Sequence, residues 1–273
     1  WTTGDPTAWM RRGAQHMATL PPPAPQQVMQ AEDFPEYCVI RGVFDVPGFQ
    51  RGILPYPLPN YGGEIEWNND GTPVQQYSRS AKFVVTIPKQ FTMPASGFPV
   101  MWFNHGAGGT ADQVFTRGAH IDAGVRVEGG GPAQIAAQKG WVTASMAGHM
   151  SLDHLGVLNG GQGVWEYDLL NPVAMRNNYA QMVWEKLVFR RFIRALQLDA
   201  GLCPQADAGA GRSVFFFDRD HEVLMAQSLG NWVGTIQTAV EPEPYIGVIY
   251  SGFAASWLRF FNDSFVKSHA IET

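Results

Sequence analysis

The sequence predicts an α/β fold with a mostly parallel central sheet and flanking helices. Between residues 97 and 252, short apolar runs of strand length alternate with segments whose apolar residues recur at helical spacing. Strands that alternate with helices form parallel sheets covered on both faces. Before residue 97 only short turns separate the β-branched runs, so these strands are expected to pair antiparallel at the N-terminal edge of the sheet. A chain of 273 residues is long enough to bury the core of such a fold.

The first part of the chain is expected to supply an arm and the edge strands. Residues 1–35 are rich in Pro, Gln and Ala, and the Pro-Pro-Pro-Ala-Pro run at 21–25 predicts a stiff spacer. We therefore expect 1–35 to form an extended N-terminal arm that packs on the surface. Strands are predicted at 37–44 and at 80–87, where a β-branched run ends at a proline.

The second part carries the regular alternation of strands and helices. The predicted elements are a strand at 98–103, a helix at 132–139, a strand at 141–146, a loop at 147–171, a helix at 172–198, a strand at 222–226, a helix at 229–240 and a strand at 245–250. The helix at 172–198 has the strongest signal, because its apolar and aromatic residues keep helical spacing and are expected to pack in the core. We predict a core domain over 36–252, with 253–273 as the start of a cap or linker.

The most specific motif is Ala226-Gln227-Ser228-Leu229-Gly230, which connects an apolar run to a predicted helix. A serine with small residues two positions before and after it is typical of a sharp strand-to-helix turn, where larger side chains would clash. Such a turn exposes the serine hydroxyl at the N-terminus of the helix. We therefore predict that Ser228 is a catalytic nucleophile.

A glycine-rich loop, His105-Gly106-Ala107-Gly108-Gly109, directly follows the predicted strand at 98–103. Glycines allow backbone N–H groups to approach a ligand closely. The N–H of Ala107 or of Gly108, together with that of Leu229, would form a two-donor oxyanion hole for the attacked carbonyl. His105 is expected to be a structural residue whose hydrogen bonds hold this loop.

The order and context of these two motifs resemble the α/β-hydrolase family of esterases and lipases. A strand that ends in His-Gly-Ala-Gly-Gly precedes the strand-Ala-Gln-Ser-Leu-Gly-helix segment by about 120 residues. The resemblance covers roughly 80–255 and departs from the family pattern in having Ala226 where the first glycine usually stands. It implies a serine hydrolase that cleaves carboxylic esters through an acyl-enzyme and needs no cofactor.

The resemblance leaves the catalytic acid and base unplaced. In the family, the acid and then the histidine follow the serine along the chain. After Ser228 the sequence offers only Asp263 and His269 in such roles, and their spacing leaves no room for the strands that normally separate acid and base. The resemblance therefore implies that a second polypeptide or a segment outside this chain completes the sheet and supplies both groups.

Other aromatic and polar residues could shape the site. Four aromatic residues near the motifs are expected to line an apolar pocket for the acyl or alcohol group: Trp165, Trp232, Phe253 and Trp257. The loop at 147–171 and the segment after 252 are the candidates for a cap over this pocket. His149, Asp153 and His154 could ligate a metal, but we expect them to be solvated loop residues and predict no metal site.

Charge and composition argue against several kinds of partner. The net charge is −5, which gives no electrostatic reason to expect nucleic acid or an anionic membrane. No apolar run approaches the roughly 18 residues of a membrane span. The sequence starts at Trp1, so we expect that a leader was removed and that the protein is secreted or periplasmic; a piece of a longer polypeptide is the alternative. Cys38 and Cys203 form either one disulfide or two buried thiols.

Two other functions fit the same motifs. A peptidase, amidase or acyltransferase could use the same scaffold, because the serine turn does not distinguish an ester from an amide. A catalytically inactive hydrolase fold could instead serve as a binding module.

Overall fold

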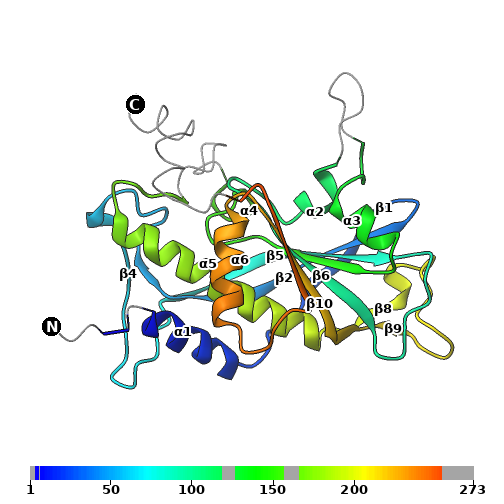
Figure 1. Ribbon diagram of the computed structural model, residues 1–273, viewed down its shortest axis with the longest axis horizontal. Helices are drawn as coiled ribbons and strands as arrows, with labels where there is room; N and C mark the ends of the chain where they lie inside the picture. Colours follow the sequence, from blue (N-terminus) through cyan, green and yellow to red (C-terminus); the bar gives the residue numbers. More distant parts are fainter. Residues whose placement is uncertain (1–3, 6, 119–126, 157–165, 254–273) are drawn as a thin grey trace.

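The computed structural model describes the chain except for residues 1–3, 6, 119–126, 157–165 and 254–273. In the described part a seven-stranded sheet runs through the molecule in the order β1-β2-β5-β7-β6-β10-β11 (Figure 1). Its strands are β1 (Gln26–Asp33), β2 (Tyr37–Gly48), β5 (Tyr77–Pro88), β7 (Val142–Met146), β6 (Phe98–Asn104), β10 (Phe217–Gln227) and β11 (Gly247–Ser251). Two small sheets pair β3 (Gln50–Gly52) with β4 (Gly62–Ile65) and β8 (Leu198–Asp199) with β9 (Val214–Phe215).

The strand directions match the prediction. β2 pairs antiparallel with β1 and β5, and β5 pairs antiparallel with β7. The pairings of β7 with β6, β6 with β10 and β10 with β11 are parallel. Within the described sheet, β1 and β5 alone run against the common direction, and both belong to the N-terminal side. This confirms the predicted α/β class, with a mostly parallel central sheet and antiparallel strands at its N-terminal edge.

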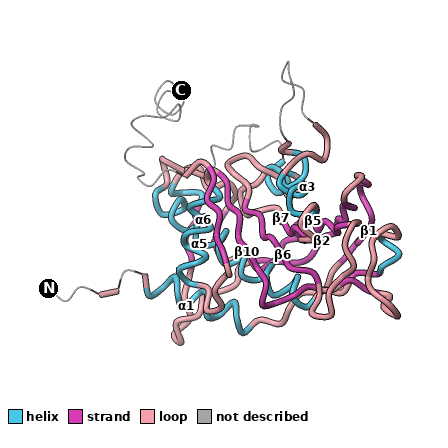
Figure 2. Tube along the Cα trace, turned by 45° about the vertical axis from the view of Figure 1, so that its right-hand side comes forward, coloured by secondary structure: helices cyan, strands magenta, loops and turns pink. Residues whose placement is uncertain are grey.

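Helices cover both faces of the sheet. On one face lie α1 (Ala8–Thr19), α5 (Pro172–Ala195) and α6 (Gly230–Val240); α2 (Gln113–Thr116) and α3 (Pro132–Ala137) lie on the other (Figure 1 and Figure 2). The residues of β2 alternate accordingly. Cys38 and Ile40 belong to the core beneath α5, whereas Tyr37 and Val39 belong to a smaller core beneath α3. A strand buried on both faces is a nearly continuous apolar run, which is why the sequence predicts it.

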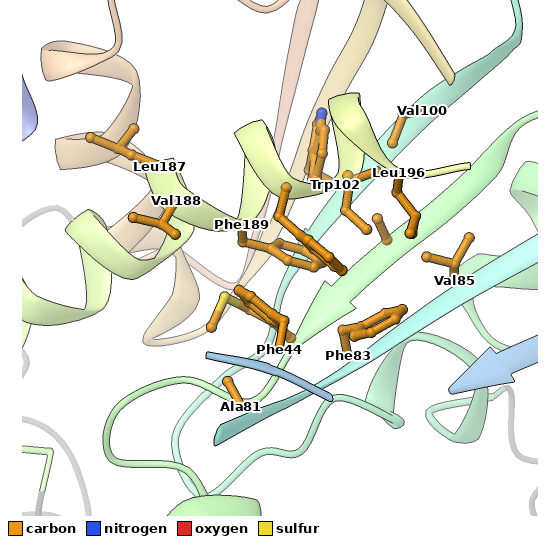
Figure 3. Packing of buried hydrophobic residues seen from close by; sticks show 14 of the residues in the cluster. Phe44, Ala81, Phe83, Val85, Val100, Trp102, Leu187, Val188, Phe189 and Leu196 are labelled. Atoms are coloured by element: carbon orange, nitrogen blue, oxygen red, sulfur yellow. The ribbon is translucent and has the colours of Figure 1, made fainter. Parts of the chain in front are cut away.

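Aromatic rings fill the centre of the larger core. Phe44 of β2 stacks on Phe192 of α5, with ring centroids 4.5 Å apart and planes 3° from parallel. Phe83 meets Phe192 edge-on at 5.0 Å, and Trp102 meets Phe189 in the same way at 5.6 Å (Figure 3). These contacts hold α5 across β2, β5 and β6, so the aromatic residues of this helix pack in the core as predicted.

The N-terminal segment differs from the extended arm that we expected. It contains α1, which buries Met10, Ala14 and Met17 on one face, and the edge strand β1. Gly13 lets α1 approach α5 closely, because a Cβ there would lie 2.0 Å from the Trp184 ring. The apolar residues of α1 recur at helical spacing, but the composition of the segment hides this short pattern.

The two cysteines form a disulfide. Cys38 of β2 and Cys203 are bridged, with their Cα atoms 5.9 Å apart. The bond ties the sheet to the turn after the short helix Ala200–Leu202, and its partners lie 165 residues apart in the sequence. This decides between the two alternatives that the sequence left open.

Element boundaries depart from the prediction in a few places. α5 ends at Ala195 because Leu196 adopts an extended conformation, with φ −71° and ψ 134°. β10 begins at Phe217, before its apolar run, and the predicted loop at 147–171 contains the short helix α4 (Leu152–Leu155). None of the helices in the described ranges is long and apolar enough to cross a membrane.

Candidate active site

Ser228 lies at the junction of β10 and α6 in a left-handed backbone conformation, with φ +54°. A serine rarely adopts this conformation, and such strain is typical of functional turns. Hydrogen bonds to the end of β11 hold the turn: Ser228 N–H donates to the carbonyl oxygen of Ser251 at 2.9 Å, and Asn231 Nδ2 donates to the same oxygen at 2.8 Å. The predicted sharp strand-to-helix turn is therefore present.

The small residues around Ser228 have identifiable neighbours. A Cβ on Gly230 would lie 2.4 Å from the carbonyl oxygen of Asn104 and 2.6 Å from that of His105, so α6 rests directly on the end of β6. Ala226 is buried, and a Cβ on Gly234 would lie 3.2 Å from its methyl group. α6 therefore has a glycine opposite Ala226, which leaves room for the Ala226 methyl group.

The glycine-rich loop lies against this turn. Gly109 N–H donates to the carbonyl oxygen of Gly106 at 3.1 Å, and Gly108 has φ +62°. A positive φ at the third residue is typical of a type II turn and favours glycine there. A Cβ on Gly106 would lie 3.0 Å from Cβ of Ser228, so the glycine-rich loop and the Ser228 turn are in direct contact.

The three expected oxyanion donors differ in what they bind. Gly108 N–H donates to Oε1 of Glu166 at 3.0 Å. The N–H groups of Ala107 and Leu229 have no hydrogen-bond partner within the described ranges. Of the two alternatives that the sequence allowed for the loop donor, Ala107 is thus the one whose N–H group is unoccupied.

His105 has the structural role that we expected. Gly148 N–H lies 3.4 Å from His105 Nε2, and His105 Nδ1 lies 2.9 Å from the carbonyl oxygen of Gly106. Burial lowers the pKa of His105 to about 4, so the ring is neutral near pH 7. The tautomer that fits both contacts donates from Nδ1 and accepts at Nε2, and it ties the glycine-rich loop to the end of β7.

A cavity of about 20 Å³ lies beside the nucleophile turn, large enough for one water molecule. Its walls include backbone and side-chain atoms of Leu229, Gly230, His105, Glu166, Lys186 and Ser151. Glu166 is 2% exposed, and burial raises its pKa to about 8. Burial also lowers the pKa of Lys186 to about 7, and Lys186 Nζ donates to the carbonyl oxygen of Met146 at 3.2 Å.

Sequence reasoning missed Glu166 and Lys186 as buried groups near the site. Lys186 interrupts the apolar face of the predicted helix at 172–198, which is a signal that could have found it. Glu166 stands between Trp165 and Tyr167, and an acidic residue between aromatic ones is only a weak indication of burial.

The loop after β7 differs from the expectation of solvated polar residues. His149 is fully buried, with Nδ1 3.7 Å from Oε1 of Glu185, and burial lowers its pKa well below the usual range. Asp153 accepts from the N–H of Ala111 at 2.8 Å and pairs with Lys82 at 3.4 Å. The expectation was wrong because α5, β5 and the loop after β6 supply partners that lie far away in the sequence. Among the described residues no group of three His, Cys, Asp or Glu side chains could hold a metal.

The expected pocket residues are only partly placed. Trp232 and Phe253 line a groove of about 660 Å³ between α1, α5 and α6, together with Trp9, Tyr179 and Ile236. Trp165 and Trp257 lie outside the described residues, as do Asp263 and His269. Within the described ranges no histidine or carboxylate hydrogen-bonds to the Ser228 hydroxyl.

No protein-family profile matches the chain, and no curated protein matches its sequence. Among solved structures, a candidate acetyl xylan esterase from Bacteroides fragilis is similar with a TM-score of 0.47 and 14% identity, over 87% of this chain and 50% of that protein. Acetyl xylan esterases from Paenibacillus and Thermoanaerobacterium both have TM-scores of 0.43 and 12% identity, over 91% and 86% of this chain. This chain covers 61% and 54% of those two proteins, so it spans about half to three-fifths of the length of all three. Because the sequence identities are this low, the proposed function rests on the geometry of this chain and not on these proteins.

Proposed function

We propose that this chain is the nucleophile-bearing part of a serine hydrolase that cleaves carboxylic esters through an acyl-enzyme on Ser228. The observation that carries the proposal is the left-handed conformation of Ser228 between β10 and α6, with the glycine-rich loop packed against it. A strained serine at a strand-to-helix junction is the recognised geometry of a nucleophile in this fold class.

In this proposal Ser228 Oγ attacks the ester carbonyl, and the N–H groups of Ala107 and Leu229 hold the oxyanion that forms. Both N–H groups lack a partner in the described part of the chain, which is what a site that waits for an oxyanion requires. Each such donor is worth about 3 kcal/mol of transition-state stabilisation. Water then hydrolyses the acyl-enzyme, and no metal or cofactor takes part.

The catalytic histidine and acid lie, in this proposal, on a further segment or a second polypeptide that continues the sheet beyond β11. In support, β11 is the edge of the described sheet, and Val248, Ile249 and Tyr250 on it are 37–49% exposed. Exposed apolar side chains on an edge strand are normally covered. Asp263 and His269 are the alternative source of these two groups within the chain.

The groove that Trp232 and Phe253 line is the proposed site for an apolar acyl or alcohol group. In support, Trp232 lies in the first turn of α6, the helix that begins beside Ser228. The disulfide supports a secreted or periplasmic location, because such bonds persist in oxidising compartments. An amide substrate, acyl transfer, or an inactive binding module remain the competing functions.

Hydrolysis of p-nitrophenyl esters of graded acyl length tests the proposal. The protein is purified with any polypeptide that stays bound to it. We expect Ser228→Ala to reduce turnover at least about 1,000-fold and Ser80→Ala, at an exposed serine on β5, to leave it unchanged. Matched p-nitroanilides separate esterase from amidase activity. Equal turnover by wild type and Ser228→Ala would exclude Ser228 as the nucleophile.

A further inference from the structure

Glu166 contacts the middle peptide of the turn that contains Ala107, the proposed loop donor of the oxyanion hole. The turn Gly106–Gly109 is closed by the bond from Gly109 N–H to the carbonyl oxygen of Gly106. Its middle peptide joins Ala107 to Gly108, and the N–H of this peptide donates to Oε1 of Glu166 at 3.0 Å. Type I and type II turns differ mainly in a flip of the middle peptide. The bond to Glu166 therefore selects one of two orientations.

The Glu166 side chain is itself held in place by burial. It is 2% exposed, and its Oε2 has no hydrogen-bond partner among the described residues. Glu166 and Ser151, whose hydroxyl is also buried without a partner, both line the small cavity beside the Ser228 turn. A cavity of this size fits one water molecule. The Gly108 N–H is the contact of the carboxyl group with the glycine-rich loop.

We propose that Glu166 is a positioning residue: by accepting the Gly108 N–H it fixes the Ala107–Gly108 peptide and with it the conformation of Ala107. The N–H of Ala107 belongs to the preceding peptide and is the proposed donor to the oxyanion of a substrate on Ser228. The inference rests on the proposed function of Ser228. Without this acceptor the middle peptide is free to flip. The flip changes ψ of Ala107, so the preceding peptide is no longer held and its Ala107 N–H loses its alignment with the Leu229 N–H. Glu166 does not touch the reacting atoms and acts through the loop.

The charge state of Glu166 affects the same site. Burial raises its pKa to about 8, so the carboxyl group is neutral near pH 7 and becomes a carboxylate at higher pH. A negative charge beneath the loop would oppose the negative oxyanion. The titratable groups that face Glu166 or its cavity are Lys186 on α5, His105 after β6, Asp168, Tyr167 and Tyr179.

Two variants separate the acceptor from the charge. Glu166→Gln keeps a neutral Oε1 acceptor at every pH, whereas Glu166→Met has similar length and no acceptor. Asp168→Asn is the matched control, because Asp168 is another buried acid with a raised pKa but accepts from Asn178 rather than from the loop. Thermal unfolding of each variant shows whether it is folded.

We expect Glu166→Met to lower kcat for a p-nitrophenyl ester about 100-fold while KM changes less than about threefold. Glu166→Gln and Asp168→Asn should stay within about threefold of wild type near pH 7. Wild type should lose kcat as the pH rises through about 8, and Glu166→Gln should not. An unchanged kcat in folded Glu166→Met, or an equal loss in Glu166→Gln, would overturn the proposal.

Amide hydrogen exchange at Gly108, followed by NMR, keeps this test independent of catalysis. We expect the Gly108 N–H to be protected in wild type and Glu166→Gln and to exchange faster in Glu166→Met. Equal protection in all three would overturn the role of Glu166 whether or not the protein hydrolyses esters. Loss of protection in Glu166→Met, combined with ester hydrolysis that does not depend on Ser228, would instead overturn the proposed function alone.

Discussion

Adding a single methyl group at Gly230 should separate the nucleophile turn from the glycine-rich loop. The new Cβ would lie 2.4 Å from the carbonyl oxygen of Asn104 and 2.6 Å from that of His105, against 3.4 Å for an ordinary contact. Both oxygens belong to the backbone at the end of β6, so no side chain can rotate away. α6 and the loop must therefore move apart by about 1 Å.

The expected cost follows from this displacement. Overpacking of this kind destabilises a protein by about 1–3 kcal/mol, and a misplacement of about 1 Å at a catalytic site lowers turnover about 100-fold. We expect both effects in Gly230→Ala. Urea unfolding measures the first, and kcat for a p-nitrophenyl ester measures the second.

Gly234→Ala is the matched control on the same helix. Its Cβ would lie 3.2 Å from the methyl group of Ala226 and 3.4 Å from Cδ2 of Leu224, so its neighbours need to move by only a few tenths of an ångström. Alanine is favoured over glycine inside a helix by about 1 kcal/mol, which offsets the crowding. Stability and kcat should therefore stay near wild type. Gly230→Ala with normal kcat, or an equal loss in Gly234→Ala, would refute the reasoning.

Three further predictions concern stability. Replacing Cys38 and Cys203 by alanine opens a loop of 165 residues and should lower the free energy of unfolding by about 3–5 kcal/mol, measured in urea without reductant; a loss below about 1 kcal/mol would contradict this. Phe44→Ala removes the ring stacked on Phe192 and should lower the free energy of unfolding by about 3–5 kcal/mol in the same assay. A loss below about 1 kcal/mol, as is usual for an exposed residue, would contradict the packing of Phe44 in the core. The pKa of Lys186 is about 7 in the folded protein and 10.5 in the unfolded chain, so between pH 7 and 10.5 the unfolded chain binds one more proton than the folded protein. Lys186 should therefore make the free energy of unfolding rise by about 1.4 kcal/mol per pH unit in this range. Lys186→Met should remove this pH dependence.

The parts of the fold that the sequence predicts are those with a local signal. β6 and the apolar part of β10 are short runs buried on both faces, and α5 keeps helical spacing over many turns. α1 was missed because its apolar spacing is short and proline-rich sequence follows it. β10 already begins at Phe217, which pairs with Phe98 of β6, so the polar residues 218–221 belong to the strand. A pattern of apolar residues does not predict them.

The site divides in the same way. The prediction for Ser228, Ala107 and Leu229 rests on a tight turn that restricts the residues around it, and that restriction is visible in the sequence. The burial of Glu166, Lys186 and His149 depends on helices and strands distant in the sequence, and no local pattern encodes it. Which of Ala107 and Gly108 has a free N–H also depended on a distant partner, Glu166.

Covalent labelling by a fluorophosphonate tests the central claim most directly, since this reagent reacts with an activated serine. The purified protein, with any polypeptide bound to it, is treated with the probe, and the modified peptide is identified by mass spectrometry. We predict one adduct, on Ser228, that is absent in Ser228→Ala and slower to form in Gly230→Ala. An adduct on another residue, or no adduct in wild type, would contradict the account of Ser228 as the activated nucleophile.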